Sequence, residues 1–206
     1  MRFSLTFNRT TRQRMLPMDY QYYVSAWIYN VLKQADKEFA QFLHETGYGK
    51  GEAKLYKLFC FSRLNFGKPK LWKEKKLFEI SEHQIYLQIS FDVAEAAMNF
   101  IRGLFMSQEF YLGDKFHGIE FKVTKIEALP EPEFQETMNY RLQTPWVVSY
   151  KTDTDKHPKY LTPKDAFFEP LAAKHLVEKY NNTRGNGTTT TDNIHIVLPN
   201  VFKRSG

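Results

Sequence analysis

Apolar side chains follow two different periods in the first part of the chain. From Arg2 to Phe7 every second residue is apolar, which is the period of a strand with one buried face. Further on, apolar residues recur at every third or fourth position, at Tyr20, Val24, Trp27, Ile28 and Val31. That spacing predicts a helix with one buried face, and it leaves Tyr29 off the apolar stripe.

A second, shorter helix is expected directly after the first. Asp36 can cap its N-terminus. Its apolar residues Phe39, Phe42 and Leu43 would then point toward the core. The glycines that follow from position 47 end this helix and place His44 in its last turn.

Three more strands and one more helix complete a regular order. Residues 54–64 form a β-rich run, and residues 85–91 alternate as a half-buried strand. Asp92 and Glu95 have the spacing of a capping box before a helix with one apolar face, and a last strand covers residues 119–123. The order β, α, β, β, α, β over about 125 residues is the ferredoxin-like split pattern of many RNA-binding domains.

Prolines and acidic residues cluster at 128–135, a composition typical of a linker. We therefore expect a first domain at 1–128 and a second at 136–206. The elements expected in the second domain are a strand near 142–150, a helix near 164–180 and a strand near 194–202. The predicted fold class is α+β with tandem ferredoxin-like (RRM-like) domains, of which the second has only a β, α, β half and is incomplete at its C-terminus.

The charge balance favours a polyanionic partner. Lysine and arginine total 29 against 23 acidic residues, the formal net charge is +6, and 16% of the residues are aromatic. Basic and aromatic side chains together suit nucleic acid with unpaired bases, although most of the rings are expected in the core.

Cysteine content and hydropathy indicate the compartment. Cys60 is the only cysteine, so neither an internal disulfide nor a cysteine-based zinc site can form. This cysteine content favours a protein that works in a reducing compartment. The strand-like N-terminus is unlike a signal peptide, and no stretch approaches the ~20 apolar residues of a membrane span. We expect a cytoplasmic protein without a membrane partner.

His44 is the best single candidate for proton transfer, because an imidazole can accept or give a proton at neutral pH. The alternative is a histidine that only satisfies the terminal carbonyl groups of its helix. Tyr29 could present its hydroxyl to a ligand, or it could simply face solvent. The HETGY segment around His44 lacks the second histidine of a metalloprotease helix, and we expect no metal and no cofactor.

Two basic segments could bind RNA. On the predicted strand, Lys57 and Arg63 share a face with two phenylalanines, a mixture that suits RNA unless both rings belong to the core. The run KPKLWKEKK at 68–76 could neutralise several phosphates and offer one ring for stacking, or it could be a solvated hairpin tip. The predicted RNA-binding residues are Lys54, Arg63, Lys68, Lys70, Trp72, Lys73, Lys75 and Lys76.

Five stretches of the chain carry a family resemblance. They are the N-terminal MRFSLTF, the helix YQYYVSAWIYNVL at 20–32, FLHE at 42–45 before a glycine-containing loop, the strand KLFCFSRL at 57–64, and LQTPWVVS at 142–149. In this order they resemble the CRISPR-associated repeat-processing endoribonucleases, the sixth Cas family within the RAMP superfamily.

The resemblance implies two tandem ferredoxin-like domains and a metal-independent cut inside each repeat of a CRISPR transcript. The ribose 2′-hydroxyl would attack the neighbouring phosphate, giving a 2′,3′-cyclic phosphate and a 5′-hydroxyl. The family's catalytic histidine and tyrosine correspond to His44 and Tyr29. Its lysine corresponds to Lys57, with Lys54 or Lys50 as alternatives.

Repeat RNA is then the expected partner, in the cytoplasm of a prokaryotic cell. A CRISPR effector complex and a homodimer are further possible partners. The runner-up function is a non-catalytic RAMP-type protein that binds repeat RNA. Members of the family usually continue into a glycine-rich loop near the C-terminus, and because this chain stops before it, we expect a weakened affinity for RNA.

Overall fold

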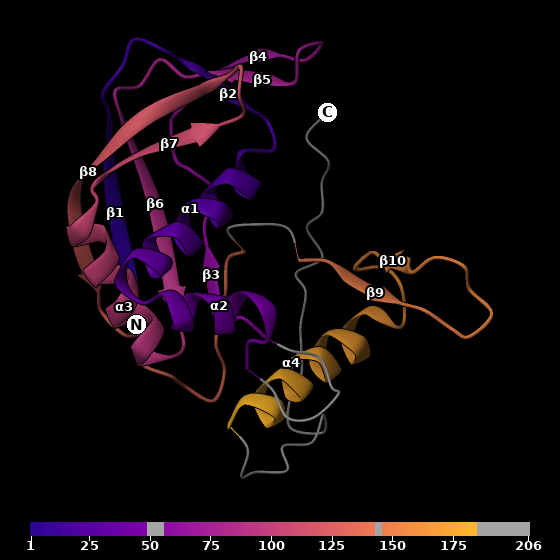
Figure 1. Cartoon of the computed structure of the whole chain (residues 1–206). Coiled ribbons are helices and arrows are strands. Elements are labelled where there is room, and N and C mark those ends of the chain that lie inside the picture. Colours follow the sequence, from indigo (N-terminus) through magenta and orange to yellow (C-terminus); the bar gives the residue numbers. More distant parts are fainter. Residues whose placement is uncertain (49–55, 143–145, 185–206) are drawn as a thin grey trace. The chain divides into compact units, whose positions relative to one another are not determined.

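Two compact units make up the chain (Figure 1). The computed structural model describes residues 1–48, 56–142 and 146–184. The first unit is Met1–Gly47 with Lys57–Thr144, and the second unit is Tyr48–Tyr56 with Pro145–Gly206. The assignment of residues 1–128 and 136–206 as folding domains stays a prediction.

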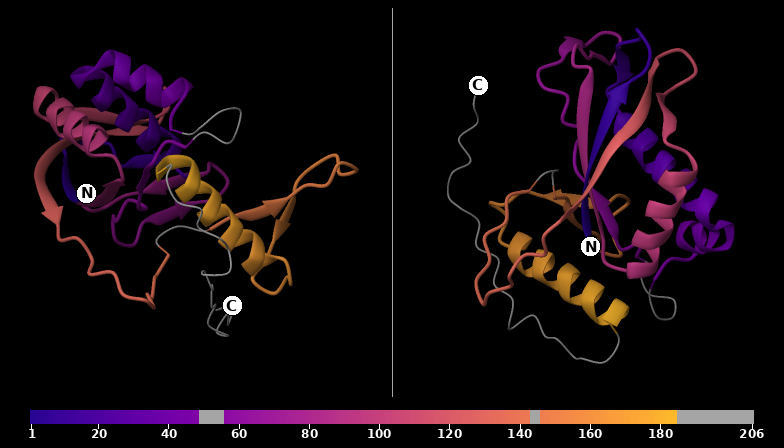
Figure 2. Two further views of the ribbon diagram at one scale, coloured as in Figure 1. Left: turned by 90° about the horizontal axis from the view of Figure 1, so that it is seen from below. Right: turned by 90° about the vertical axis from the view of Figure 1, so that its left-hand side faces the viewer.

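The first unit is built on a five-stranded antiparallel sheet. In spatial order its strands are β3 (Phe59–Phe61), β6 (Gln84–Phe91), β1 (Arg2–Arg9), β8 (Gly118–Leu129) and β7 (Glu109–Gly113). Two helices, α1 (Tyr20–Ala35) and α3 (Ala94–Met106), pack against each other on one face of this sheet (Figure 2). The elements β1, α1, β3, β6, α3 and β8 follow the predicted order, and the spatial order β3, β6, β1, β8 is that of a ferredoxin-like sheet.

Three short strands and one short helix are added to this framework. They are β2 (Met15–Pro17), β4 (Lys70–Trp72), β5 (Leu77–Glu79) and α2 (Lys37–Glu45). The strands form a separate sheet in the order β2, β5, β4, and α2 follows α1 directly and contacts it.

The core of the first unit lies between the sheet and the two long helices. Burial alternates along β6, with Ile85, Leu87 and Ile89 buried and Tyr86 and Gln88 between them exposed, as the period-two pattern predicts. The helices approach closely at Gly103, where a Cβ atom would lie 1.9 Å from the carbonyl oxygen of Val31. Glycine at this position therefore lets α3 pack directly on α1, the helix that carries Tyr29.

Three local predictions are wrong or incomplete. Of the β-rich run expected at 54–64, the described residues 56–64 contain one strand, β3, because Leu58 has a φ of 52° and interrupts the extended backbone just before it. The side chain of Phe42, expected in the core, is 38% exposed. Strand β7 was not expected at all, and it pairs along its whole length with the first half of β8.

The described part of the second unit contains a hairpin and a helix. These are β9 (Val148–Tyr150), β10 (Lys159–Leu161) and α4 (Phe168–Arg184). Val148, Phe168 and Ala172 form their small buried core. The strand and helix near 142–150 and 164–180 are thus confirmed with shifted bounds, whereas the strand expected at 194–202 lies outside the described residues.

Candidate active site

Local sequence signals position His44 at an exposed helix end. The side chain of Asp36 accepts a hydrogen bond from the backbone N–H of Phe39 at 2.8 Å, which caps the start of α2 as predicted. At the other end, the backbone N–H groups of Thr46 and Gly47 both donate to the carbonyl oxygen of Phe42. Gly47 has a φ of 72°, so it can reverse the chain there at little cost. His44 is therefore held in the last turn with its ring exposed.

Tyr29 packs its ring against the imidazole of His44. The two ring centroids are 5.2 Å apart in an edge-to-face arrangement, and Phe59 of β3 packs edge-to-face on Tyr29 at 5.7 Å. This half-buried position raises the pKa of Tyr29, and the cause is desolvation. The phenol therefore stays protonated at neutral pH and can donate a hydrogen bond.

Lys57 reaches the same place from the segment before β3. Its Nζ donates a hydrogen bond to the backbone carbonyl oxygen of His44 at 2.6 Å. That carbonyl is one of the terminal groups of α2 that have no partner within the helix. Burial lowers the pKa of Lys57. The structure thus brings the three predicted catalytic residues together from α1, α2 and the start of the β3 segment.

A cavity of about 260 Å³ opens between α1 and α2 beside these residues. Its lining residues are Tyr29, Asn30, Lys33, Lys37, Ala40, Gln41, His44 and Glu45. Lys33 and Lys37 were not proposed as site residues from the sequence. Helical spacing could have found them, because Lys33 follows Tyr29 by one turn and Lys37 precedes His44 by two turns.

The arrangement can support acid–base chemistry on a phosphodiester. His44 can transfer a proton, Tyr29 can donate a hydrogen bond, and the ammonium groups of three lysines can stabilise negative charge. The edge-to-face contact and the capping hydrogen bond fix where the imidazole and the ammonium of Lys57 lie. Among the residues that the structure describes, no group of three or more histidine, cysteine, aspartate or glutamate side chains is close enough to hold a metal ion.

The lysine-rich run at 68–76 lies on the hairpin of β4 and β5, in a part of the first unit away from the cavity beside His44. Tyr20, the first residue of α1, packs its ring on Phe78 of β5 at 6.1 Å, so the β4–β5 hairpin lies at the N-terminal end of α1. Tyr29 is nine residues further, about 14 Å along the helix axis. Figure 1 shows the hairpin well apart from α2. The structure therefore does not bring these lysines to the cavity beside His44.

Within the hairpin two lysines lie near one aromatic ring. The Nζ atoms of Lys70 and Lys75 lie 4.5 and 5.7 Å from the centroid of Trp72. The indole N–H of Trp72 donates to Glu79 at 3.0 Å. The six predicted RNA-binding residues of this basic hairpin are all exposed, and they are Lys68, Lys70, Trp72, Lys73, Lys75 and Lys76.

The remaining predicted RNA-binding residues lie on the segment around β3. Arg63 is exposed two residues after that strand. Lys54, together with Lys50 as the other alternative for the catalytic lysine, falls outside the described residues. No helix in the described parts of the chain is long and apolar enough to cross a membrane.

Comparison with solved structures identifies the fold. The chain is similar in structure to a Cas6-related protein from Pyrococcus furiosus, with a TM-score of 0.72 at 24% identity. It is also similar to a RAMP protein described as binding different RNA substrates, with a TM-score of 0.67 at 23% identity. Each similarity covers 88% of this chain and 70% of the other. These similarities confirm the tandem ferredoxin-like fold of the α+β class.

Sequence comparison gives the family. The family described as CRISPR-associated protein Cas6, N-terminal, matches residues 15–127, which is more than half of the chain. The chain belongs to the Cas6 family. A CRISPR-associated endoribonuclease Cas6 of Methanocaldococcus jannaschii is 32% identical over 125 residues, which make up 61% of this chain and 44% of that relative.

Proposed function

We propose that this protein binds CRISPR repeat RNA and cleaves precursor transcripts within each repeat, without a metal ion. The observation that carries the proposal is the convergence of Tyr29, His44 and Lys57 beside one cavity, inside the region that matches the Cas6 family. The Cas6 relative from Methanocaldococcus jannaschii is named as an endoribonuclease, which agrees with that chemistry. The reaction would take place in the prokaryotic cytoplasm, where such transcripts are made.

The proposed reaction is an internal transesterification. The 2′-oxygen forms a bond to the neighbouring phosphorus while the bond from phosphorus to the 5′-oxygen breaks, leaving a 2′,3′-cyclic phosphate and a 5′-hydroxyl. One proton leaves the 2′-hydroxyl and one is delivered to the departing 5′-oxygen, and His44 is positioned for one of these transfers. Tyr29 and Lys57 would stabilise the charge that builds on the phosphate oxygens.

Lys33 and Lys37 extend the positive charge along the same cavity. His44 follows Lys37 by seven positions on α2, a distance of about 10 Å along the helix. We propose that these two lysines bind phosphates next to the one that is cleaved. They would position the RNA strand along the groove between α1 and α2.

The alkaline side of the pH–rate profile should report on Lys57. Because burial lowers its pKa, the ammonium loses its proton below the usual lysine value of about 10.4, and the cleavage rate should fall there. Lys57→Arg keeps the charge at any accessible pH, so the fall should move to higher pH. The measurement is the single-turnover rate from neutral pH to about pH 10. An identical alkaline fall in both proteins would remove Lys57 from the mechanism.

The basic hairpin should contribute to affinity and not to chemistry. Replacing Lys70 or Lys73 by alanine should weaken binding to any RNA and flatten the plot of log K against log salt by ~0.7 to 0.9 per lost contact. The control is Lys174→Ala, which removes an exposed lysine paired with Glu178 on α4. A slope that does not change in either hairpin variant would mean that these lysines form only a solvated hairpin tip.

A non-catalytic role in binding repeat RNA is the second candidate function. It is favoured by the structural similarity to the RAMP protein described as binding different RNA substrates. Association with a CRISPR effector complex and formation of a homodimer stay predictions under either function.

Incubation of the protein with repeat RNA in EDTA separates the two candidate functions. The RNA should be the repeat encoded by the CRISPR array of the same genome, and binding should be measured in the same buffer. The nuclease proposal predicts a single cut in each repeat. Binding without cleavage, both with EDTA and with added Mg²⁺, would favour the non-catalytic role.

A further inference from the structure

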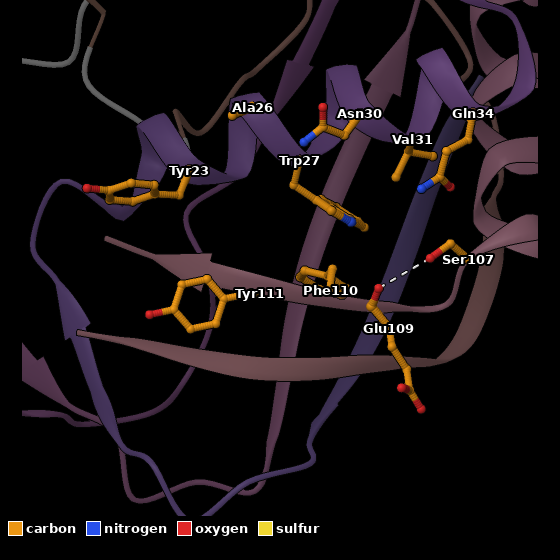
Figure 3. Close-up of a pocket in the computed structure, with 10 residues that line it drawn as sticks. All are labelled: Tyr23, Ala26, Trp27, Asn30, Val31, Gln34, Ser107, Glu109, Phe110 and Tyr111. Carbon is orange, nitrogen blue, oxygen red and sulfur yellow. Dashed lines mark hydrogen bonds between the residues drawn. The ribbon is translucent and has the colours of Figure 1, made fainter. Parts of the chain in front are cut away.

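A second cavity of the first unit lies between α1 and β7 (Figure 3). Its volume of about 360 Å³ is within the range of small-ligand sites, roughly 300 to 1,000 Å³. The polar and aromatic residues that line it are Tyr23, Trp27, Asn30, Gln34, Ser107, Glu109, Phe110 and Tyr111. The proposed mechanism uses none of these side chains. One of them, Asn30, also lines the cavity beside His44.

The floor of this cavity is aromatic. The ring of Trp27 stacks on Phe110 of β7, with centroids 4.3 Å apart and planes inclined by 23°. Trp27 is only 6% exposed, yet among the described residues none accepts a hydrogen bond from its indole N–H. Figure 3 shows the indole nitrogen toward the end of the cavity where Gln34 and Ser107 lie. The indole N–H is therefore available to donate a hydrogen bond to a ligand or to water in the cavity.

The cavity is polar but carries no positive charge. No lysine or arginine of the described residues lines it. Glu109 belongs to the lining, but its carboxylate points away from α1 in Figure 3 and pairs with Lys122 at 3.8 Å. At the end where Tyr23 and Tyr111 lie, Asp19 and Asp114 act electrostatically on the Tyr23 hydroxyl. A phosphate is therefore disfavoured here, whereas a neutral, flat and polar group suits these walls.

We propose that this cavity holds an unpaired RNA base from a nucleotide next to the cleavage site. The inference rests on the proposed function and extends it. Because Asn30 lines both cavities, a strand whose phosphate lies beside His44 can send a neighbouring base over α1 toward β7. Lys33 and Lys37 then contact phosphates on one side of α1, while the cavity without positive charge takes the base on the other side.

Each part of the cavity has a role in recognising such a base. The amides of Asn30 and Gln34 and the N–H of Trp27 offer donors and acceptors to the base edge. The rings of Tyr23 and Tyr111 lie at the same end of the cavity (Figure 3), where a base can stack on them. The Tyr111 hydroxyl donates to the backbone oxygen of Asp114 at 2.7 Å, which fixes the position of that ring.

Abasic substitution in the RNA tests this assignment directly. The probe is repeat RNA with a 2′-deoxy sugar before the cut, so that binding is measured without cleavage. A single abasic site is introduced at one of four positions, the two nucleotides before the cut and the two after it, in four separate RNAs. In the wild-type protein one abasic site should weaken binding about tenfold. The variants Gln34→Ala and Tyr23→Ala should bind intact RNA more weakly and should lose most of that sensitivity.

The matched control is Gln21→Ala, because Gln21 is an exposed glutamine on the same helix that lines neither cavity. It should keep the wild-type sensitivity to the abasic site. Equal sensitivity in Gln34→Ala, Tyr23→Ala and the wild type would overturn the base-binding proposal, as would an absence of any sensitive position. If the wild type cleaves unmodified RNA in parallel, either result leaves the proposed function intact. A wild-type protein that does not bind repeat RNA overturns both.

Discussion

Replacing His44 by alanine should lower the single-turnover rate of repeat cleavage by about 10²- to 10⁴-fold, the range for loss of one general acid or base. The affinity for RNA should change little, because the imidazole is exposed at the end of α2 and the basic residues around it remain. The fold should also persist, since the buried residues of α2 are Phe39, Ala40 and Leu43. Rate and affinity are measured on the same repeat RNA.

His83 provides the matched control for this substitution. It is an exposed histidine just before β6 that does not line the cavity of His44. His83→Ala should cleave at the wild-type rate. A His44→Ala protein that retains the wild-type rate would show that the proton transfer is made by another group.

The second large effect is expected from a change in the RNA substrate, with the protein left unchanged. A 2′-deoxy sugar on the nucleotide just before the cut removes the nucleophile of the proposed reaction, so no product should be detected. Binding should remain close to that of the unmodified repeat, since only one hydroxyl group is lost. The measurement is product formation over time in EDTA with saturating protein.

A 2′-deoxy sugar placed one nucleotide away from the cut is the control substrate. It should be cleaved at nearly the full rate, because its nucleophile is intact. Cleavage of both deoxy substrates at the rate of the unmodified repeat would mean that water, and not the ribose, attacks the phosphate.

Much of the candidate site follows from local sequence signals. The periodicity of α1, the Asp36 cap and the terminal glycine determine where Tyr29 and His44 lie on their helices, and these signals depend on nearby residues only. The position of Lys57 was predicted on a continuous strand. The structure instead places it just before the positive φ of Leu58. In that segment side chains do not alternate between two faces as they do in a regular strand.

The parts of the structure that were missed depend on distant contacts. Strand β7 exists because it pairs with β8, and the cavity between α1 and β7 forms only when both are in place. The basic hairpin was predicted as a segment, but its separation from His44 follows from the packing of Phe78 on Tyr20. A single sequence without homologues carries no direct signal for such pairings.

The mass of the 5′ fragment released from repeat RNA in EDTA tests the central claim most directly. A fragment that ends in a 2′,3′-cyclic phosphate is one water lighter than one with an open phosphate, and the partner fragment begins with a 5′-hydroxyl. We predict the cyclic form with the wild-type protein and a rate lower by orders of magnitude with His44→Ala. A 3′-hydroxyl on the 5′ fragment with a 5′-phosphate on its partner, or cleavage that starts only when a divalent metal ion is added, would contradict the account.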